Sequence, residues 1–217
     1  MIGVVIAMQS EADILLQTMN VSRSLTVSGK TVHVGVAYGK ELALCVCGVG
    51  KVNAALGTQL LVSKFDAGKI LNFGVAGSLN KETELCGVYQ ISHATQFDFD
   101  LVQINGTSIG TLNEYETPYL ELSCISGFEK RKLGTADRFN DDPEDYALLT
   151  KELGADIRDM EGGAIVQAAY AAQLPVYMVK AISDVAGNGS TTQQYLINRD
   201  RALQNLQEKL PEIFEAL

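Results

Sequence analysis

Continuous apolar runs alternate with helix-forming segments along the chain. The run IGVVIA near the start is typical of a strand that is buried on both faces of a sheet. The segment that begins near Glu161 is rich in alanine and predicts a helix. The strands predicted in this way are residues 2–7, 22–28, 31–37, 41–47, 69–73, 87–98, 132–136 and 176–182.

Capping and turn residues place the helices between these strands. Ser10 is a candidate N-cap, with Glu11 and Asp13 in the following turn, where the positive end of the helix dipole favours carboxylates. A second helix is expected from the GVGK segment at 48–51 to about Lys64. Gly29-Lys30 is expected to turn a hairpin, with further helices from Pro143, near Glu161 and from Thr191, and loops at 106–119, 140–145 and 187–190.

Strands separated by helices predict an α/β architecture. We expect one domain over residues 1–217, built on a mixed, mostly parallel twisted sheet that is flanked by helices. In such sheets ligands bind at the carboxyl ends of the strands. Residues that follow a strand end are therefore the first candidates for a functional site.

Composition narrows the class of protein. With 47% hydrophobic and 20% charged residues, the chain has the profile of an ordinary globular protein. Asp and Glu outnumber Lys and Arg by 26 to 17, and the net charge of −9 argues against non-specific nucleic-acid binding. No apolar stretch approaches the length of a membrane span, and the first residues lack the basic region of a signal peptide. We therefore expect a cytoplasmic protein without nucleic-acid or membrane partners.

Cysteines and histidines offer little material for a metal site. The CVC segment at 45–47 lacks the C-x-x-C spacing of zinc and redox motifs. The two histidines, His33 and His93, lie in separate predicted strands. Asp98 and Asp100 would point to the same face of a strand, which fits either a metal site or, more simply, a solvated strand face. We expect no metal.

Three acids stand at or just beyond predicted strand ends. Glu11 follows the first strand, Asp184 ends a late one, and Glu161 opens the helix between them. Taken singly, Glu11 and Glu161 are explained as first-turn carboxylates and Asp184 as a turn or cap residue. Their placement at the same edge of one sheet favours a shared functional site instead.

Two glycine-rich segments follow predicted strands. GVGK at 48–51 is not a Walker loop, and GVAG at 74–77 is not a dinucleotide fingerprint. Small residues at these places let the backbone approach a ligand closely, although plain tight turns account for them as well. No Arg lies in or beside either segment to clamp an oxyanion, so phosphate binding is not favoured. Phe139, next to the polar loop, is either a lid aromatic or a core contact.

Five motifs together resemble the nucleoside phosphorylase/hydrolase superfamily, and most of all its 5′-methylthioadenosine/S-adenosylhomocysteine nucleosidases. The motifs are IAMQSEADIL, GVGKVNAA, NFGVAGSL, DMEGGAI and KAISDVAG. They run in order from residue 2 to about residue 187, while the stretch from Gly106 to Lys130 matches poorly. The resemblance implies that water cleaves the N-glycosidic bond of a 5′-substituted purine nucleoside, without a cofactor and in a homodimer.

The resemblance also implies roles for individual residues. Glu11 would activate the attacking water, Asp184 would donate to N7 of the purine, and Glu161 would hold the ribose hydroxyls. An acid beside N7 helps because a purine leaves poorly as an anion, and this role requires a raised pKa at Asp184. The implied substrate-binding residues are Met8, Ala76, Gly77, Phe139, Asn140, Met160 and Ser183, together with Glu161.

Three positions depart from the family pattern. Phosphorylases of the superfamily carry Arg and Ser for phosphate where this chain has Asn72 and Val75, so water is the expected nucleophile. The nucleosidases usually carry Ser in place of Val75 and Arg in place of Lys180. The stretch after Asp100 lacks the family's aromatic lining for a 5′-alkylthio group. A futalosine hydrolase, a phosphorolytic nucleoside phosphorylase and a non-catalytic nucleoside-binding protein remain alternatives.

Overall fold

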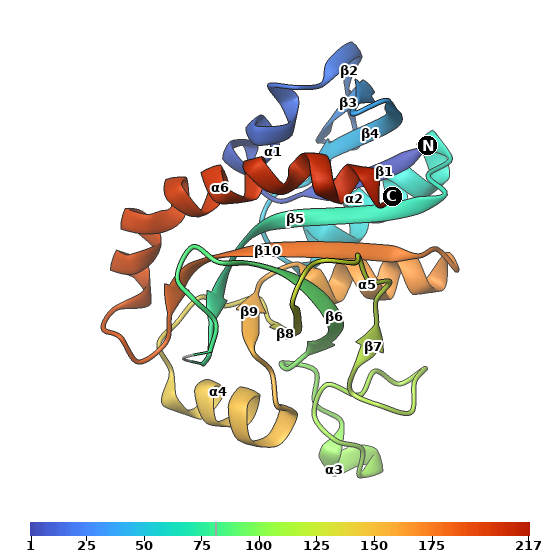
Figure 1. The fold of residues 1–217 in the computed structure, drawn as a ribbon. Helices are drawn as coiled ribbons and strands as arrows, with labels where there is room; N and C mark the ends of the chain where they lie inside the picture. The colour runs from blue at the N-terminus through green and yellow to red at the C-terminus, as the bar shows by residue number, and fades with distance from the viewer. Residues whose placement is uncertain (81) are drawn as a thin grey trace.

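The computed structural model describes residues 1–80 and 82–217, which form strands and helices in alternation (Figure 1). Its strands are β1 (Ile2–Ile6), β2 (Asn20–Val27), β3 (Lys30–Ala37), β4 (Lys40–Val46), β5 (Lys69–Ser78), β6 (Val88–Gln96), β7 (Leu120–Glu121), β8 (Lys130–Thr135), β9 (Ile157–Asp159) and β10 (Val176–Val185). Its helices are α1 (Gln9–Leu16), α2 (Lys51–Phe65), α3 (Val102–Asn105), α4 (Pro143–Ala147), the π-helical turn Leu148–Leu153 that continues α4, α5 (Gly162–Ala171) and α6 (Thr191–Glu215). The predicted α/β class is confirmed.

The strands form one sheet that closes on itself at one end. Their order is β10-β6-β8-β9-β5-β1-β4-β3-β2, and β10 pairs with β5 as well. This extra pairing joins β5, β10, β6, β8 and β9 into a ring, while β1 to β4 extend from it as an open sheet. The pairings within the described chain are half parallel and half antiparallel, so the expectation of a mostly parallel sheet was too strong.

Consecutive residues of β1 pack into two separate cores, one on each face of the sheet. Val5 joins the core under α2 and α5, whereas Val4 and Ile6 join the core under α1 and α6. Side chains alternate along a strand, so a strand covered on both faces needs apolar residues at every position. This explains the run IGVVI, every residue of which is buried. Figure 1 shows α6 along one side of β5 and β10, with α5 on the other.

Two predicted strand ends and one predicted cap differ from the structure. The strand beginning at Lys69 does not stop at Phe73 but continues through the glycines to Ser78. Likewise β10 does not end before Ser183 but includes Ser183 and Asp184. Ser10 lies inside α1, whose N-cap position is Met8. Small and polar residues resemble a turn in sequence, but here they belong to strands that line a cavity.

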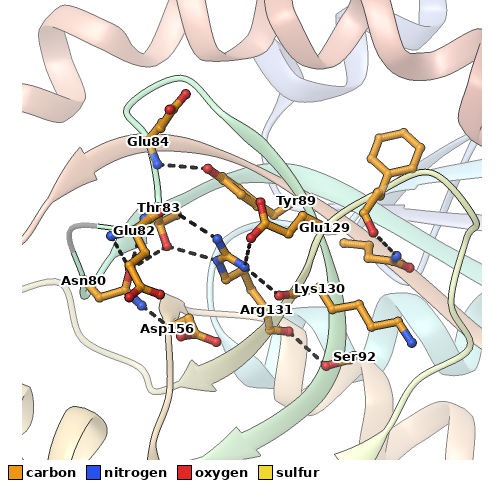
Figure 2. Close-up of polar contacts among 12 residues, drawn as sticks. Asn80, Glu82, Thr83, Glu84, Tyr89, Ser92, Glu129, Lys130, Arg131 and Asp156 are labelled. Atoms are coloured by element: carbon orange, nitrogen blue, oxygen red, sulfur yellow. Dashed lines mark hydrogen bonds and ion pairs between the residues drawn. The ribbon is translucent and has the colours of Figure 1, made fainter.

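A buried arginine fixes the segment that leads into β6 (Figure 2). Arg131 donates from Nε to Thr83 Oγ1 at 3.2 Å and from Nη2 to the Glu82 carbonyl at 3.3 Å. Its guanidinium lies 4.6 Å from the centre of the Tyr89 ring and pairs with Glu129 at 2.7 Å. These contacts hold Glu82 and Thr83, which precede β6, against the closed ring. No helix in residues 1–80 and 82–217 is long and apolar enough to cross a membrane.

Candidate active site

A cavity of about 340 Å³ opens at the carboxyl ends of β1, β5 and β10. All three predicted acids line it, and the ring of strands brings them together although they are far apart in sequence. Of the ten predicted site residues, nine line this cavity, namely Met8, Glu11, Ala76, Gly77, Phe139, Met160, Glu161, Ser183 and Asp184. Asn140 does not line it, and its amide Nδ2 instead donates to Asp145 Oδ2 at 3.0 Å.

Glu11 is held by backbone donors from two segments. Its Oε1 accepts from the Val75 N–H at 2.8 Å and its Oε2 from the Met8 N–H at 3.2 Å, and the residue is 4% exposed. A Cβ at position 74 would lie 2.4 Å from Oε1, so only glycine leaves room for the carboxylate. Burial raises the pKa of Glu11, and the charge of Lys180 opposes that rise.

Glu161 occupies the N-cap position of α5 and meets the other glycine-rich segment. Its Oε1 accepts from the Gly50 N–H at 2.9 Å. Gly50 has a φ of +100°, a conformation that side-chain-bearing residues rarely adopt. Burial, followed by the charge of Asp159, raises the pKa of Glu161 to about 7. The proton affinity of this carboxyl therefore falls in the range where enzymes use acids and bases.

Lys180 is a buried cation among Glu11, Asp159 and Glu161. Lys180 Nζ pairs with Asp159 Oδ2 at 3.0 Å, and both side chains are almost fully buried. Burial lowers the pKa of Lys180, but the charges of Asp159, Glu161 and Glu11 outweigh it, so that the pKa is raised overall. Lys180 is therefore a permanent positive charge that partly neutralises three acids.

Asp184 lines the cavity from β10, opposite Gly77 of β5. The Ser183 hydroxyl donates to its Oδ2 at 2.8 Å, and Oδ1 has no partner among the described residues. Burial raises the pKa of Asp184, against the hydrogen bond from Ser183 and the charge of Arg158. A Cβ at Gly77 would lie 2.7 Å from Oδ1, so this acid also approaches a glycine of β5. A protonated Asp184 can donate from its unpaired oxygen into the cavity.

A family model described as the phosphorylase superfamily matches residues 1–217. The chain belongs to the phosphorylase superfamily. A 5′-methylthioadenosine/S-adenosylhomocysteine nucleosidase of Listeria innocua is 31% identical over 209 residues, which cover 88% of each chain. A protein of the same name from Bacillus cereus is 28% identical over 202 residues, or 87% of each chain. The predicted family resemblance is thereby confirmed.

Solved structures of the superfamily share the fold. A futalosine hydrolase of Helicobacter pylori superimposes with a TM-score of 0.90 at 22% identity, covering 100% of this chain and 97% of the other. A 5′-methylthioadenosine/S-adenosylhomocysteine nucleosidase of the same organism, crystallised with butyl-thio-DADMe-Immucillin-A, also has a TM-score of 0.90 at 22% identity, with 100% and 98% coverage. The backbone fold is thus common to both kinds of enzyme.

At two of the positions that depart from the superfamily pattern, the residue of this chain makes a hydrogen bond within the protein. Asn72 is buried in β5 and donates from Nδ2 to the Val5 carbonyl at 2.8 Å. Val75 donates its N–H to Glu11.

Asp98 and Asp100 lie beyond the end of β6, not on a strand face, and Asp98 pairs with Lys51 at 2.6 Å. No group of three or more potential metal ligands occurs within the described parts of the chain.

Sequence reasoning about this superfamily member missed two charged residues of the cavity. Asp159 directly precedes the quoted Met160-Glu161 pair, and its pairing with Lys180 becomes visible only when β9 and β10 are placed in the ring. Arg158 also lines the cavity, opposite Gly77 in the sheet register. The spacing of residues carries no signal for either, because both contacts depend on which distant strands pair.

Proposed function

We propose that this protein hydrolyses the N-glycosidic bond of a 5′-substituted purine nucleoside of the methylthioadenosine/adenosylhomocysteine type. The observation that carries the proposal is the meeting of Glu11, Glu161 and Asp184 around one cavity, with the pKa of each carboxyl raised. Curated relatives that are 28% and 31% identical bear the name of that activity. A volume of about 340 Å³ suits a small ligand of this size.

In this proposal the chemistry divides between two carboxyl groups that line the cavity, those of Glu11 and Asp184. Water attacks C1′ of the ribose while the C1′–N9 bond breaks and its electron pair goes to the purine. Asp184, whose pKa is raised by burial, would give a proton to N7. Glu11 takes a proton from the attacking water, and nearby Lys180 favours the ionised form that this role needs. The products are free base and a ribose derivative, and no cofactor is needed.

Binding of the sugar and base is assigned to the remaining lining residues. Glu161 would accept hydrogen bonds from the ribose hydroxyls and stabilise positive charge on the sugar in the transition state. Met8 and Met160 would pack against the sugar. Phe139, which is 46% exposed and meets the Tyr195 ring edge-on, would stack on the base. Ala76, Gly77 and Ser183 would line the base end, and the backbone near Asn140 would meet the base edge.

Futalosine hydrolysis is the second candidate. The futalosine hydrolase and the nucleosidase of Helicobacter pylori both superimpose with a TM-score of 0.90, so the backbone fold does not choose between the two substrates. The test is incubation with methylthioadenosine, adenosylhomocysteine, futalosine and inosine, with and without phosphate, while free base is measured. We expect release without phosphate from a 5′-substituted nucleoside. Release that requires phosphate would overturn hydrolysis, and no release from any of the four would overturn the enzyme assignment.

Loss of Asp184 provides the matched test of mechanism. Asp184→Asn is expected to cut turnover by about 100-fold or more, the scale of a lost proton donor. Asp13→Asn, an exposed carboxyl on α1, is the control and should leave turnover unchanged. Full activity in Asp184→Asn would remove this residue from the mechanism.

We also propose a homodimer in which a second copy covers the start of α2. Val49 lines the cavity, and Val52 and Leu56 continue from it as an exposed apolar stripe, 70% and 56% exposed. Residues three and four apart lie on one helix face, so the stripe is continuous with the open side of the site.

All four cysteines are free thiols, which supports a cytoplasmic location. Residues 1–217 are proposed to act as one domain.

A further inference from the structure

Arg158 and Asp184 face each other across a glycine of the sheet. Gly77 of β5 lies opposite Arg158 of β9 on one side and opposite Asp184 of β10 on the other. Directly opposed residues project their side chains from the same face of a sheet. A Cβ at Gly77 would lie 2.7 Å from Asp184 Oδ1 and 3.4 Å from Arg158 Nε. The absence of a side chain at Gly77 therefore leaves a carboxyl and a guanidinium side by side in the cavity.

Both groups carry a buried polar atom that lacks a hydrogen bond. Asp184 is 1% exposed, and its Oδ1 has no partner within the described chain. The Arg158 side chain is 11% exposed, and its Nη2 likewise has no hydrogen-bond partner there, with Asp141 Oδ1 at 3.9 Å. Buried polar groups are normally paired, so two neighbouring unpaired groups in one cavity indicate a polar ligand edge.

The guanidinium also lies beside the aromatic ring that would stack on the base. The guanidinium carbon of Arg158 is 5.9 Å from the centre of the Phe139 ring. Of the other charged groups that line the cavity, Glu11 and Glu161 accept backbone N–H bonds and Asp159 is paired with Lys180. Among the described residues that line the cavity, Arg158 is the one cation, and it can face the base.

We propose that Arg158 is a specificity-determining residue that favours purines with an oxygen at position 6, an inference that rests on the proposed function. N7 and position 6 are neighbours on one purine edge. A 6-oxopurine presents two acceptors there, N7 and O6, whereas adenine presents N7 and a donating amino group. A guanidinium has donors only, so beside an Asp184 that donates to N7 it matches O6 and opposes an amino group. The relatives' names refer to adenine nucleosides, and Arg158 turns this chain toward their 6-oxo counterparts.

The test compares two nucleosides that differ only at position 6, methylthioadenosine and methylthioinosine. For the wild-type protein we expect a higher kcat/KM for methylthioinosine. Arg158→Gln, which provides an acceptor and a donor, should shift the ratio toward methylthioadenosine by at least about 5-fold, because a side chain that reads a base edge discriminates on this scale. Arg158→Lys keeps the charge and should shift the ratio less. Arg23→Gln, an exposed arginine on β2, is the control that should leave the ratio unchanged.

A wild-type preference for methylthioadenosine, or an unchanged ratio in Arg158→Gln, would overturn the inference. The ratio is independent of how much active protein each preparation contains, so partial unfolding of a variant does not mimic the effect. If the wild-type protein cleaves neither nucleoside, the proposed function fails separately. Calorimetric titration with the same two nucleosides then reports base preference directly, with tighter binding of methylthioinosine expected, and weaker or equal binding would overturn the inference.

Discussion

Replacement of Gly74 by alanine tests whether the position of the Glu11 carboxylate controls activity. The new Cβ would lie 2.4 Å from Oε1 and 2.9 Å from Cδ of Glu11, closer than non-bonded atoms approach each other. The Glu11 side chain cannot move aside without losing hydrogen bonds, because its two oxygens accept from the Val75 and Met8 N–H groups at 2.8 and 3.2 Å. The substitution therefore forces the carboxylate away from at least one donor.

The expected magnitudes separate activity from folding. Loss of a hydrogen bond to a charged group costs about 1.5–3 kcal/mol, and overpacking a core position costs about 1–3 kcal/mol. Alanine returns roughly 0.5–1 kcal/mol in an element interior, because glycine loses more conformational freedom on folding. Gly74→Ala should thus remain folded. A catalytic group displaced by about 1 Å can lower the rate by about 100-fold, which is the loss expected in kcat/KM.

The assay is release of free base from methylthioadenosine and methylthioinosine, alongside thermal unfolding of the same samples. Gly68→Ala is the matched control, because no atom lies within 4 Å of a Cβ built there. It should retain full activity. If the activity of Gly74→Ala is within about threefold of wild type, the position of the Glu11 carboxylate does not control the rate, and the reasoning is refuted.

Three further results are expected. Lys180→Met removes the cation from beside buried Asp159 and should lower the free energy of unfolding by about 3–5 kcal/mol in urea denaturation, and a loss below about 1 kcal/mol would contradict this. The pKa of Glu161 is raised from 4.5 to about 7, so folding favours the protonated carboxyl. The stability that the protonated carboxyl contributes is fully present below pH 4.5 and is lost as the pH rises through 7. Relative to Glu161→Gln, the unfolding free energy of wild type should fall over that range, and parallel pH profiles would contradict the shift. Leu56→Glu should convert a dimer to a monomer in sedimentation, unlike Lys64→Glu at the other end of α2, and an unchanged mass would exclude that face.

Most of the fold could be predicted because buried strands leave a direct mark in sequence. Every residue of β1 must be apolar, since its two faces meet different cores, and the run IGVVI records this. The hairpin was likewise found, but its turn is Ser28-Gly29, one residue earlier than the predicted Gly29-Lys30, and both turn residues have positive φ. Strand ends near the cavity were not found, because the residues that end β5 and β10 face a hollow instead of a core. Polar and small residues at such places resemble turns.

The acids of the site could be proposed from sequence, whereas their charge partners could not. Glu11, Glu161 and Asp184 each stand near a strand end or helix start, and strand ends of such a sheet gather at one edge. Asp159 and Arg158 depend instead on how β9 pairs with β8 and β5. A three-residue strand has too short a pattern to reveal which strands it pairs with. The ion pair between Asp159 and Lys180 and the approach of Arg158 to Gly77 could therefore not be predicted from the sequence.

The glycine-rich segments bear on the choice between water and phosphate. They were expected to let backbone approach a ligand, and each instead approaches one of the protein's own carboxyl groups. The N–H of Gly50 binds Glu161, and the N–H of Val75 binds Glu11. The backbone donors of the two glycine-rich segments are therefore occupied by carboxylates, and a phosphate dianion placed beside Glu11 and Glu161 would meet like charge in a buried site. Lys180 cannot serve it either, because its ammonium is held by Asp159. Neutral water is the nucleophile that this arrangement admits, so adding phosphate to the base-release assay should leave the rate unchanged.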